Sequence, residues 1–301
     1  MSDRIGIFSK PASPVVAQLA PELVRWLEQR GYAVELDAAT AAVTGRKALA
    51  AAEAGEGANG GEAAPEAWPG PPPRLAIVLG GDGTLLRVAR LLGSTPGGAA
   101  TPLLGVNLGT LGFLTEVPAT RLYASLEAIL AGHYREDRRQ RLAAAAWRGD
   151  QCLLRGDAWN EAVIGKGALA RIVDFDLLID GAVVSAYRAD GLIISTATGS
   201  TAYSLSAGGP VLDPRVTALL ITPICPHTLS NRPLIVHDTA QVEVRLRPPA
   251  GSTYLTLDGQ EGTELQAGDR VVCELSAHAV NLVRLPDYSF FAVLKNKLRW
   301  G

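Results

Sequence analysis

The chain has 301 residues, a formal net charge of −2 at pH 7 and 48% hydrophobic residues. This length allows two domains and a sizeable core, and the near-neutral charge gives no electrostatic footprint for nucleic acid or acidic membranes. The cysteines Cys152, Cys225 and Cys273 have no metal-ligand spacing and favour a reducing compartment. Because no signal peptide or membrane-spanning run is found, we expect a cytoplasmic protein that binds neither nucleic acid nor membranes.

The N-terminal part alternates strand and helix patterns. Residues 4–9 predict a strand, residues 15–30 carry apolar residues at helical spacing that Gly31 can end, and residues 32–37 predict a second strand. A strand, a helix and a strand in this order predict a parallel sheet. From about residue 54 to 73, Ala, Gly, Glu and Pro dominate, which predicts a flexible surface insertion.

The stretch that follows the insertion is the most informative in the chain. Residues 75–79 are all apolar and predict a strand buried on both faces, and apolar spacing from Leu85 onward predicts a helix. A glycine loop separates them, Gly80-Gly81-Asp82-Gly83-Thr84. A strand, a tight glycine loop and a helix present backbone N–H groups to a phosphate. The loop is neither a dinucleotide fingerprint nor a P-loop, because it lacks the third glycine and the lysine.

Asp82 is unexpected inside such a loop, because a carboxylate repels the phosphates that the loop would attract. In one interpretation, Asp82 accepts a proton from a hydroxyl group that attacks a phosphate. In the other, the loop is an ordinary strand-to-helix turn in which Asp82 is the N-cap of the helix. The loop alone favours neither interpretation.

A second glycine loop follows the next predicted strand, residues 102–107. It carries glycines at 109 and 112 and leads to an amphipathic helix at residues 121–132. Loops after the carboxyl ends of parallel strands line the ligand crevice of an open sheet. We therefore expect both glycine loops at the same edge of the sheet.

Beyond Arg138 the pattern changes to short strands separated by turn signals such as Asp180-Gly181 and Asp258-Gly259. Such a series predicts an antiparallel, sandwich-like domain. The predicted strands include residues 172–179, 182–187, 192–195, 241–247, 252–257 and 270–275.

Two polar clusters lie in this β-rich half. Asn160-Glu161 follows a predicted strand and either binds an adenine edge or a ribose diol, or forms a simple turn. Seven hydroxyl residues lie from Ser195 to Ser206, besides Tyr203, and a capped short helix explains one or two of them. This surplus predicts a nucleotide pocket in which Tyr203 stacks and the hydroxyls bind ribose and phosphate oxygens. No G-x-S-x-G is present, which excludes a serine-hydrolase elbow.

These motifs together resemble those of one family. The Asp82 loop is similar to the loop shared by NAD kinases, lipid kinases and 6-phosphofructokinases, and residues 105–115 closely resemble the NAD kinase form of the next loop. The later motifs fall in NAD kinase order, namely Asn160-Glu161, Asp190-Gly191, Gly199-Ser200-Thr201-Ala202-Tyr203 and Leu257-Asp258-Gly259-Gln260. The resemblance to NAD kinases covers residues 4 to about 294, except for the insertion.

This resemblance implies an α/β domain with a Rossmann-like parallel sheet at residues 1–137. It implies an all-β sandwich domain that binds NAD at residues 138–285, and a segment at 286–301 that returns to the first domain. NAD would lie between the domains. The implied reaction is ATP + NAD⁺ → ADP + NADP⁺, in which the 2′-hydroxyl of the adenosine ribose is the nucleophile and Asp82 the general base. Mg²⁺ or Mn²⁺ would accompany ATP, polyphosphate is an alternative donor, and the protein would be a homodimer or homotetramer.

The resemblance also implies which residues bind the nucleotides. They are Gly80, Gly81, Asp82, Gly83, Thr84, Arg87, Phe113, Asn160, Glu161, Arg171, Arg188, Asp190, Thr201, Ala202, Tyr203, Ser204, Leu205, Ser206 and Gln260. Two other functions remain alternatives. A lipid kinase of the diacylglycerol or sphingosine type would share the Asp82 loop but expose an apolar groove. A non-catalytic NAD-sensing module would use Asp82 only as a cap.

Overall fold

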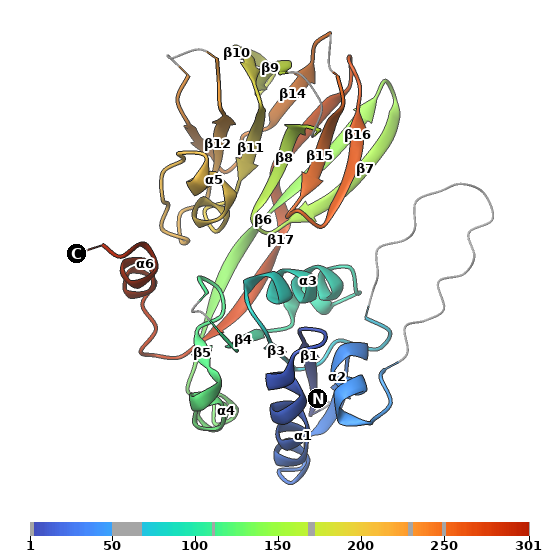
Figure 1. Cartoon of the computed structure of the whole chain (residues 1–301), viewed down its shortest axis with the longest axis vertical. Coiled ribbons are helices and arrows are strands. Elements are labelled where there is room, and N and C mark those ends of the chain that lie inside the picture. The colour runs from blue at the N-terminus through green and yellow to red at the C-terminus, as the bar shows by residue number, and fades with distance from the viewer. Residues whose placement is uncertain are drawn as a thin grey trace, which may run out of the picture. The chain divides into compact units, whose positions relative to one another are not determined.

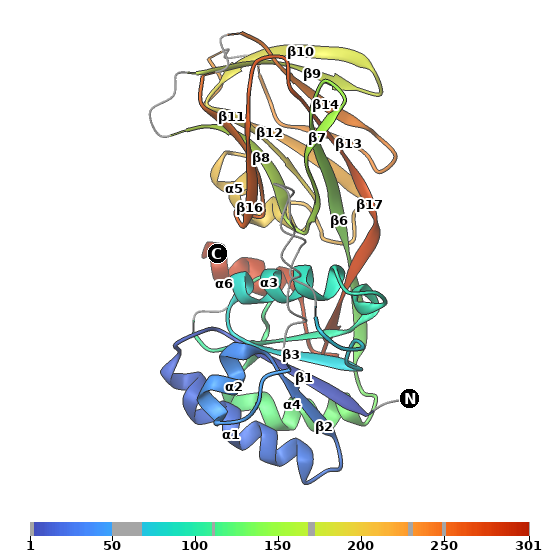
Figure 2. The same cartoon turned by 90° about the vertical axis from the view of Figure 1, so that its right-hand side faces the viewer.

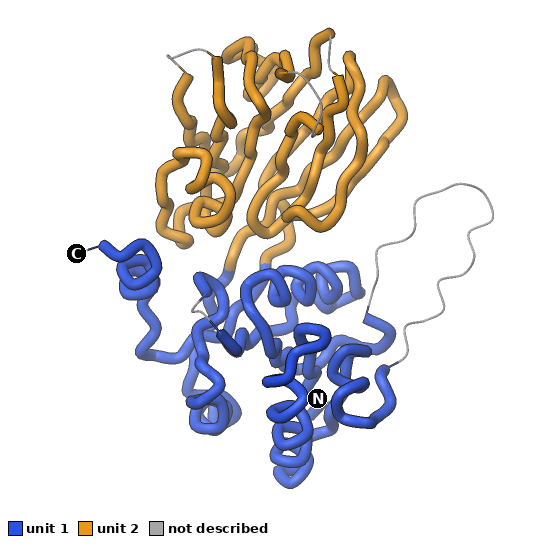
Figure 3. The backbone as a smooth tube through the Cα atoms, viewed as in Figure 1, with its two compact units in different colours: residues 1–138, 280–301 blue, residues 139–279 orange. Residues whose placement is uncertain are grey.

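A computed structural model describes residues 3–49, 68–109, 112–167, 172–227, 231–248 and 251–300 (Figure 1). The chain divides into two compact units (Figure 3). Unit 1 comprises residues 1–138 and 280–301, and unit 2 comprises residues 139–279. No helix in the described ranges is long and apolar enough to cross a membrane.

Unit 1 is built on a parallel sheet, as its sequence predicts. The strand order is β4-β3-β1-β2, and each pairing between these neighbours is parallel. On the other side of β4, β5 and the end of β17 also pair in parallel with it. The strands are β1 (Arg4–Ser9), β2 (Ala33–Leu36), β3 (Leu75–Leu79), β4 (Leu103–Asn107), β5 (Val117–Pro118) and β17 (Arg270–Arg284).

Helices cover both faces of this sheet. α1 and α4 lie on one face and α3 lies on the other, as the two views agree (Figures 1 and 2). Apolar residues of α1 and α4, such as Leu23 and Leu126, join the strands in one core. The helices of unit 1 are α1 (Pro14–Glu28), α2 (Ala38–Thr44), α3 (Asp82–Gly93), η1 (Gly98–Ala100), η2 (Ala119–Arg121), α4 (Leu122–Leu130) and α6 (Phe290–Leu298).

The predicted flexible insertion is packed at its C-terminal end. Residues 54–67 lie outside the described part of the chain. Trp68, however, is 4% exposed, its backbone N–H donates to Thr95 Oγ1 at 2.8 Å, and its ring lies 4.9 Å from that of Phe8. The prediction of a flexible surface segment is therefore wrong at Trp68, because this aromatic side chain buries its surface against the first strand.

Unit 2 is a sandwich of two antiparallel sheets, again as predicted. Phe175 and Val244 from one sheet share a core with Ile194 and Leu255 from the other. One sheet contains β6 (Arg135–Arg148), β7 (Gln151–Ala158), β9 (Val173–Ile179), β10 (Ala182–Ala189), β14 (Val242–Leu246) and β17. The other contains β8 (Glu161–Lys166), β11 (Gly191–Ser195), β12 (Ala218–Ile224), β13 (Leu234–His237), β15 (Thr253–Leu257) and β16 (Glu261–Leu265).

Turns in unit 2 set the strand registers. In the first turn φ is 50° at Asp180 and 78° at Gly181, and in the second it is 50° at Asp258 and 65° at Gly259. Positive φ at both central residues matches the twist of a hairpin, which explains the choice of Asp-Gly. Two short helices, η3 (Gly199–Thr201) and α5 (Tyr203–Ser206), follow β11.

Candidate active site

The Asp82 carboxylate binds the second glycine loop and does not cap its own helix. Gly81 is the N-cap of α3, with no side-chain cap. Asp82 Oδ2 accepts a hydrogen bond from the N–H of Phe113 at 2.8 Å. Asp82 Oδ1 accepts three, from the N–H of Leu114 at 3.1 Å and from the N–H and Oγ1 of Thr115, both at 3.0 Å. The N-cap interpretation of Asp82 is therefore wrong.

This contact between the loops requires a glycine at position 112. A Cβ atom built on Gly112 would overlap the Asp82 carboxylate and lie 2.5 Å from Thr115 Oγ1. The missing side chain is what allows the second loop to wrap around the carboxylate. Thr110 and Leu111, which precede Gly112, lie outside the described residues.

The first glycine loop has one packed and two open glycines. A Cβ atom on Gly80 would overlap the side chain of Thr84, whereas one on Gly81 or Gly83 would meet no described atom within 4 Å. Gly81 and Gly83 therefore leave the backbone at the start of α3 accessible. Backbone N–H groups at the start of a helix, together with its dipole, attract anions.

Arg87, a predicted ligand contact, is engaged in an internal ion pair. Its Nη2 atom lies 2.8 Å from Asp37 Oδ2 and 3.4 Å from the carbonyl oxygen of Ser9. Asp37 is 7% exposed and also accepts from the N–H of Thr40 at the start of α2. Arg87 thus links α3 to the start of α2. Phe113, another predicted contact, is half-buried with Lys297 Nζ 5.5 Å from its ring centroid.

In unit 2, Asp258 shapes the corner that carries Asn160 and Glu161. Its carboxylate accepts from the backbone N–H groups of Trp159, Asn160 and Glu161 at 2.7, 2.8 and 3.1 Å. These bonds hold the predicted pair at the start of β8. Sequence reasoning did not assign Asp258 this role, because its partners lie almost one hundred residues earlier.

The Glu161 carboxyl group is buried and unusually basic. Glu161 is 7% exposed, and its Oε2 atom has no hydrogen-bond partner among the described residues. Burial raises the pKa of Glu161 to about 8, with a further rise from the Asp258 charge and an opposing effect of the Tyr203 N–H. Burial also raises the pKa of Asp258, although its three backbone N–H bonds lower it. A buried, unpartnered carboxyl oxygen is typical of a ligand site.

A cavity of about 310 Å³ in unit 2 brings Asp190 and Tyr203 together. Lys166 Nζ lies 2.8 Å from Asp190 Oδ1, and the residues Tyr203 and Tyr254 are both more than 40% exposed. Sequence reasoning missed Lys166 and Tyr254, since strand pairing brings them here and neither belongs to a motif. The lining residues are Val163, Gly165, Lys166, Asp190, Tyr203, Ile224, Tyr254 and Thr256.

Most hydroxyls after β11 bind the protein itself. Three of them donate to backbone carbonyl oxygens: Thr196 Oγ1 to Trp159 at 2.7 Å, Ser200 Oγ to Ala197 at 2.6 Å and Thr201 Oγ1 to Thr198 at 3.2 Å. A fourth, Ser204 Oγ, forms a hydrogen bond of 2.8 Å with Thr222 Oγ1. The interpretation that these hydroxyls lack a structural role is therefore wrong. They bind groups of this segment and of neighbouring segments, and so help to hold η3 and α5 in place.

The other predicted contacts include neighbours of these clusters, an exposed arginine and a residue outside the described chain. Arg188 has a side chain that is 66% exposed and 4.0 Å from Asp174. Gln260 is exposed and completes the Asp258-Gly259 turn. Ala202 precedes α5, which contains the half-buried Leu205 and the exposed Ser206. Arg171 is outside the described residues.

Comparisons with known proteins agree across both units. The protein-family model of the ATP-NAD kinase N-terminal domain matches residues 5–134, and the family model of the ATP-NAD kinase C-terminal domain matches residues 159–285. An NAD kinase of Geobacter metallireducens is 46% identical over 298 residues, which is 99% of this chain and 99% of that protein.

Two solved structures are similar over nearly the whole chain. A yeast NADH kinase complexed with NADH is 26% identical, with a TM-score of 0.85 over 100% of this chain and 88% of that one. An NAD kinase from Archaeoglobus fulgidus in complex with ATP is 23% identical, with a TM-score of 0.72 over 98% of each chain, and shows the same fold. From both domain models and the full-length relative, the chain belongs to the ATP-NAD kinase family, whose members are enzymes that phosphorylate NAD.

Proposed function

We propose that this chain transfers the terminal phosphoryl group of ATP to the 2′-hydroxyl of the adenosine ribose of NAD⁺, giving NADP⁺ and ADP. Asp82 is the general base. The observation that carries this role is the asymmetric use of its two oxygens: among the described residues Oδ1 accepts three hydrogen bonds and Oδ2 accepts one. A carboxylate has about four lone-pair sites, two on each oxygen. Oδ2 therefore retains one lone pair for the hydroxyl proton.

The loop that binds Asp82 also fits this role. Four donors orient the carboxylate without help from the substrate, and such preorganisation removes the cost of arranging the base during the reaction. In phosphoryl transfer the base contributes less than alignment, and general base catalysis typically adds roughly 10²–10⁴-fold to the rate.

The ATP phosphates are proposed to lie against the first glycine loop. Gly81 and Gly83 leave the start of α3 open, and the helix dipole there favours negative charge. ATP enters as its complex with Mg²⁺ or Mn²⁺, and polyphosphate is an alternative donor. The other proposed nucleotide contacts in unit 1 are Gly80, Thr84, Arg87 and Phe113. Arg87 would have to break its ion pair with Asp37 to bind a nucleotide.

Unit 2 supplies the proposed NAD contacts. Glu161 offers its unpartnered Oε2 atom to a ribose hydroxyl, and Asn160 is held beside it by Asp258. The exposed ring of Tyr203 gives a stacking surface at the cavity that contains Asp190. The remaining proposed contacts are Arg171, Arg188, Thr201, Ala202, Ser204, Leu205, Ser206 and Gln260.

We further propose a cytoplasmic homodimer or homotetramer that acts on nucleotides rather than on nucleic acid or membranes. A lipid kinase is not favoured, since the full-length relative is an NAD kinase. The domain limits stay proposed at residues 1–137, 138–285 and 286–301, close to the two units.

One assay separates the candidate functions. The protein is incubated with MgATP and, in turn, NAD⁺, NADH or a lipid diol, and the phosphorylated product is measured. We expect NADP⁺ from ATP and NAD⁺. A phosphorylated lipid would instead indicate the lipid kinase, and NAD⁺-dependent stabilisation without any ATP turnover would indicate the sensing module.

A further inference from the structure

Arg284, at the end of β17, is a buried arginine in contact with several segments of unit 1. Its side chain is 1% exposed. Nη1 donates to the carbonyl oxygen of Leu114 at 3.0 Å and to Glu116 Oε2 at 2.9 Å. Nε donates to Asp137 Oδ2 at 3.0 Å, and the guanidinium lies 4.0 Å from the ring centroid of Tyr288. This large set of contacts fixes the guanidinium in one place.

One of these contacts leads directly to Asp82. The carbonyl of Leu114 and the N–H of Thr115 are the two ends of a single planar peptide group. Arg284 donates to that carbonyl, and the N–H donates to Asp82 Oδ1 at 3.0 Å. A charged donor on the carbonyl polarises the peptide group and strengthens its N–H as a donor. Arg284 therefore acts on the carboxylate through one peptide group.

We propose that Arg284 is a positioning residue for phosphoryl transfer. Through the Leu114–Thr115 peptide it holds the Asp82 carboxylate in the orientation that leaves Oδ2 available to the hydroxyl proton. This inference rests on the proposed role of Asp82 as general base. It adds a residue about two hundred positions away in the sequence, whose buried side chain acts on Asp82 only through this peptide.

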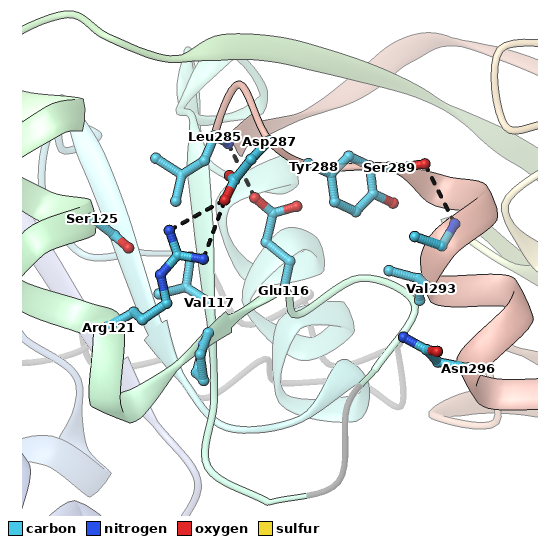
Figure 4. Close-up of a pocket in the computed structure, with 12 residues that line it drawn as sticks. Glu116, Val117, Arg121, Ser125, Leu285, Asp287, Tyr288, Ser289, Val293 and Asn296 are labelled. Atoms are coloured by element: carbon cyan, nitrogen blue, oxygen red, sulfur yellow. Dashed lines mark hydrogen bonds and ion pairs between the residues drawn. The ribbon is translucent and has the colours of Figure 1, made fainter.

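Glu116 holds Arg284 in turn. Figure 4 shows its carboxylate directed toward the C-terminal segment, where Oε1 accepts the backbone N–H of Leu285 at 3.1 Å. Its other oxygen accepts from Arg284. Burial raises the pKa of Glu116, and the Arg284 charge opposes that rise. Glu116 and Asp137 thus supply the negative charge that a buried guanidinium requires.

A neighbouring arginine provides a matched control. Arg121 also binds the C-terminal segment, through two hydrogen bonds of 3.2 Å to Asp287 Oδ2 (Figure 4). Both side chains of this pair are about 60% exposed, and among the described residues no hydrogen bond joins either of them to the loop that holds Asp82. Arg121→Met therefore removes an ion pair between an arginine and the same segment, without disturbing the Leu114–Thr115 peptide.

The test measures kcat, both KM values and urea stability for Arg284→Met, Arg284→Lys and Arg121→Met. We expect Arg284→Met to lower kcat at least about 10-fold, while both KM values stay within about 2-fold of the wild type. A displaced base reduces the stabilisation of the transition state but leaves substrate binding unchanged. Arg284→Lys recovers part of kcat, since an ammonium group can still donate to Leu114. Arg121→Met keeps the kcat of the wild type.

Combination with Asp82→Asn separates this inference from the function on which it rests. If Arg284 acts through Asp82, Arg284→Met in the Asp82→Asn background adds no further loss. The same fold-loss in both backgrounds, or equal kcat for Arg284→Met and Arg121→Met, would overturn the positioning role. Asp82→Asn with normal kcat would instead refute the base itself. If Arg284→Met does not unfold cooperatively, Arg284→Lys takes its place in each comparison, with kcat expected between wild type and Asp82→Asn.

Discussion

Glu161→Gln gives a prediction whose size follows from the structure. The carboxyl group is buried near Asp258, and its pKa is raised to about 8 from an ordinary value of 4.5. Glutamine has nearly the same shape but does not titrate. The substitution therefore isolates the free energy that this one proton contributes to folding.

The sign follows from which state binds the proton more tightly. Because the pKa of Glu161 is higher in the folded protein, its stabilising contribution is complete below the unfolded pKa near 4.5 and is lost as the pH rises through about 8. Each pKa unit is worth about 1.4 kcal/mol, so the whole effect is about 5 kcal/mol. Between about pH 5.5 and about pH 9, this contribution to the free energy of unfolding of the wild type falls by about 3 kcal/mol.

Urea unfolding of both proteins at several pH values measures this loss. Other titrating groups largely cancel in the difference, so the free energy of unfolding of Glu161→Gln minus that of the wild type should increase by about 3 kcal/mol from about pH 5.5 to about pH 9. A difference that stays constant over this range would refute the account of a buried, protonated carboxyl group.

Two further substitutions test the contacts around Asp82 and α3. Gly112→Ala places a Cβ atom against the Asp82 carboxylate, and we expect it to lower kcat at least about 10-fold. Gly109→Ala, whose Cβ meets no described atom within 4 Å, should keep normal kinetics. Arg87→Met removes the guanidinium that pairs with the buried Asp37 carboxylate. It should lower the free energy of unfolding by about 1–3 kcal/mol. An increase in KM for ATP with unchanged stability would show instead that Arg87 binds the nucleotide.

Local pattern was sufficient for the central strand, loop and helix. All five residues of β3 are buried, so an unbroken apolar run was enough to identify it. The apolar residues of α3 return at helical spacing, and its buried positions follow that spacing. These features depend on neighbours within one or two turns of the chain, which is the range that sequence patterns describe.

Long-range hydrogen bonds were not predictable in the same way. The donors to Asp82 lie 31 to 33 residues later, and those to Asp258 lie 97 to 99 residues earlier. Nothing in the local pattern indicates such partners, since the bonds depend on how loops of different strands meet. The prediction for the hydroxyls after β11 was wrong for a related reason: the sequence alone does not distinguish a Ser200 that bonds within the protein from one that binds a ligand.

Short elements also escaped prediction. α2 has seven residues, mainly Ala and Thr, and offers no apolar stripe of useful length. Asp37 begins it, because its Oδ1 accepts the N–H of Thr40 at 2.9 Å. Such a cap is visible in the sequence only as an Asp three residues before a Thr, which is too common to identify a helix.

Turnover of Asp82→Asn, measured beside its affinity for NAD⁺, tests the central claim most directly. We expect kcat to fall at least about 100-fold while the Kd for NAD⁺ changes little, because the amide cannot accept the hydroxyl proton. Thr115→Val is the control, since it removes one bond to Oδ1 and keeps the carboxylate. An Asp82→Asn protein with near-normal kcat would contradict the account, whatever the effect of Thr115→Val.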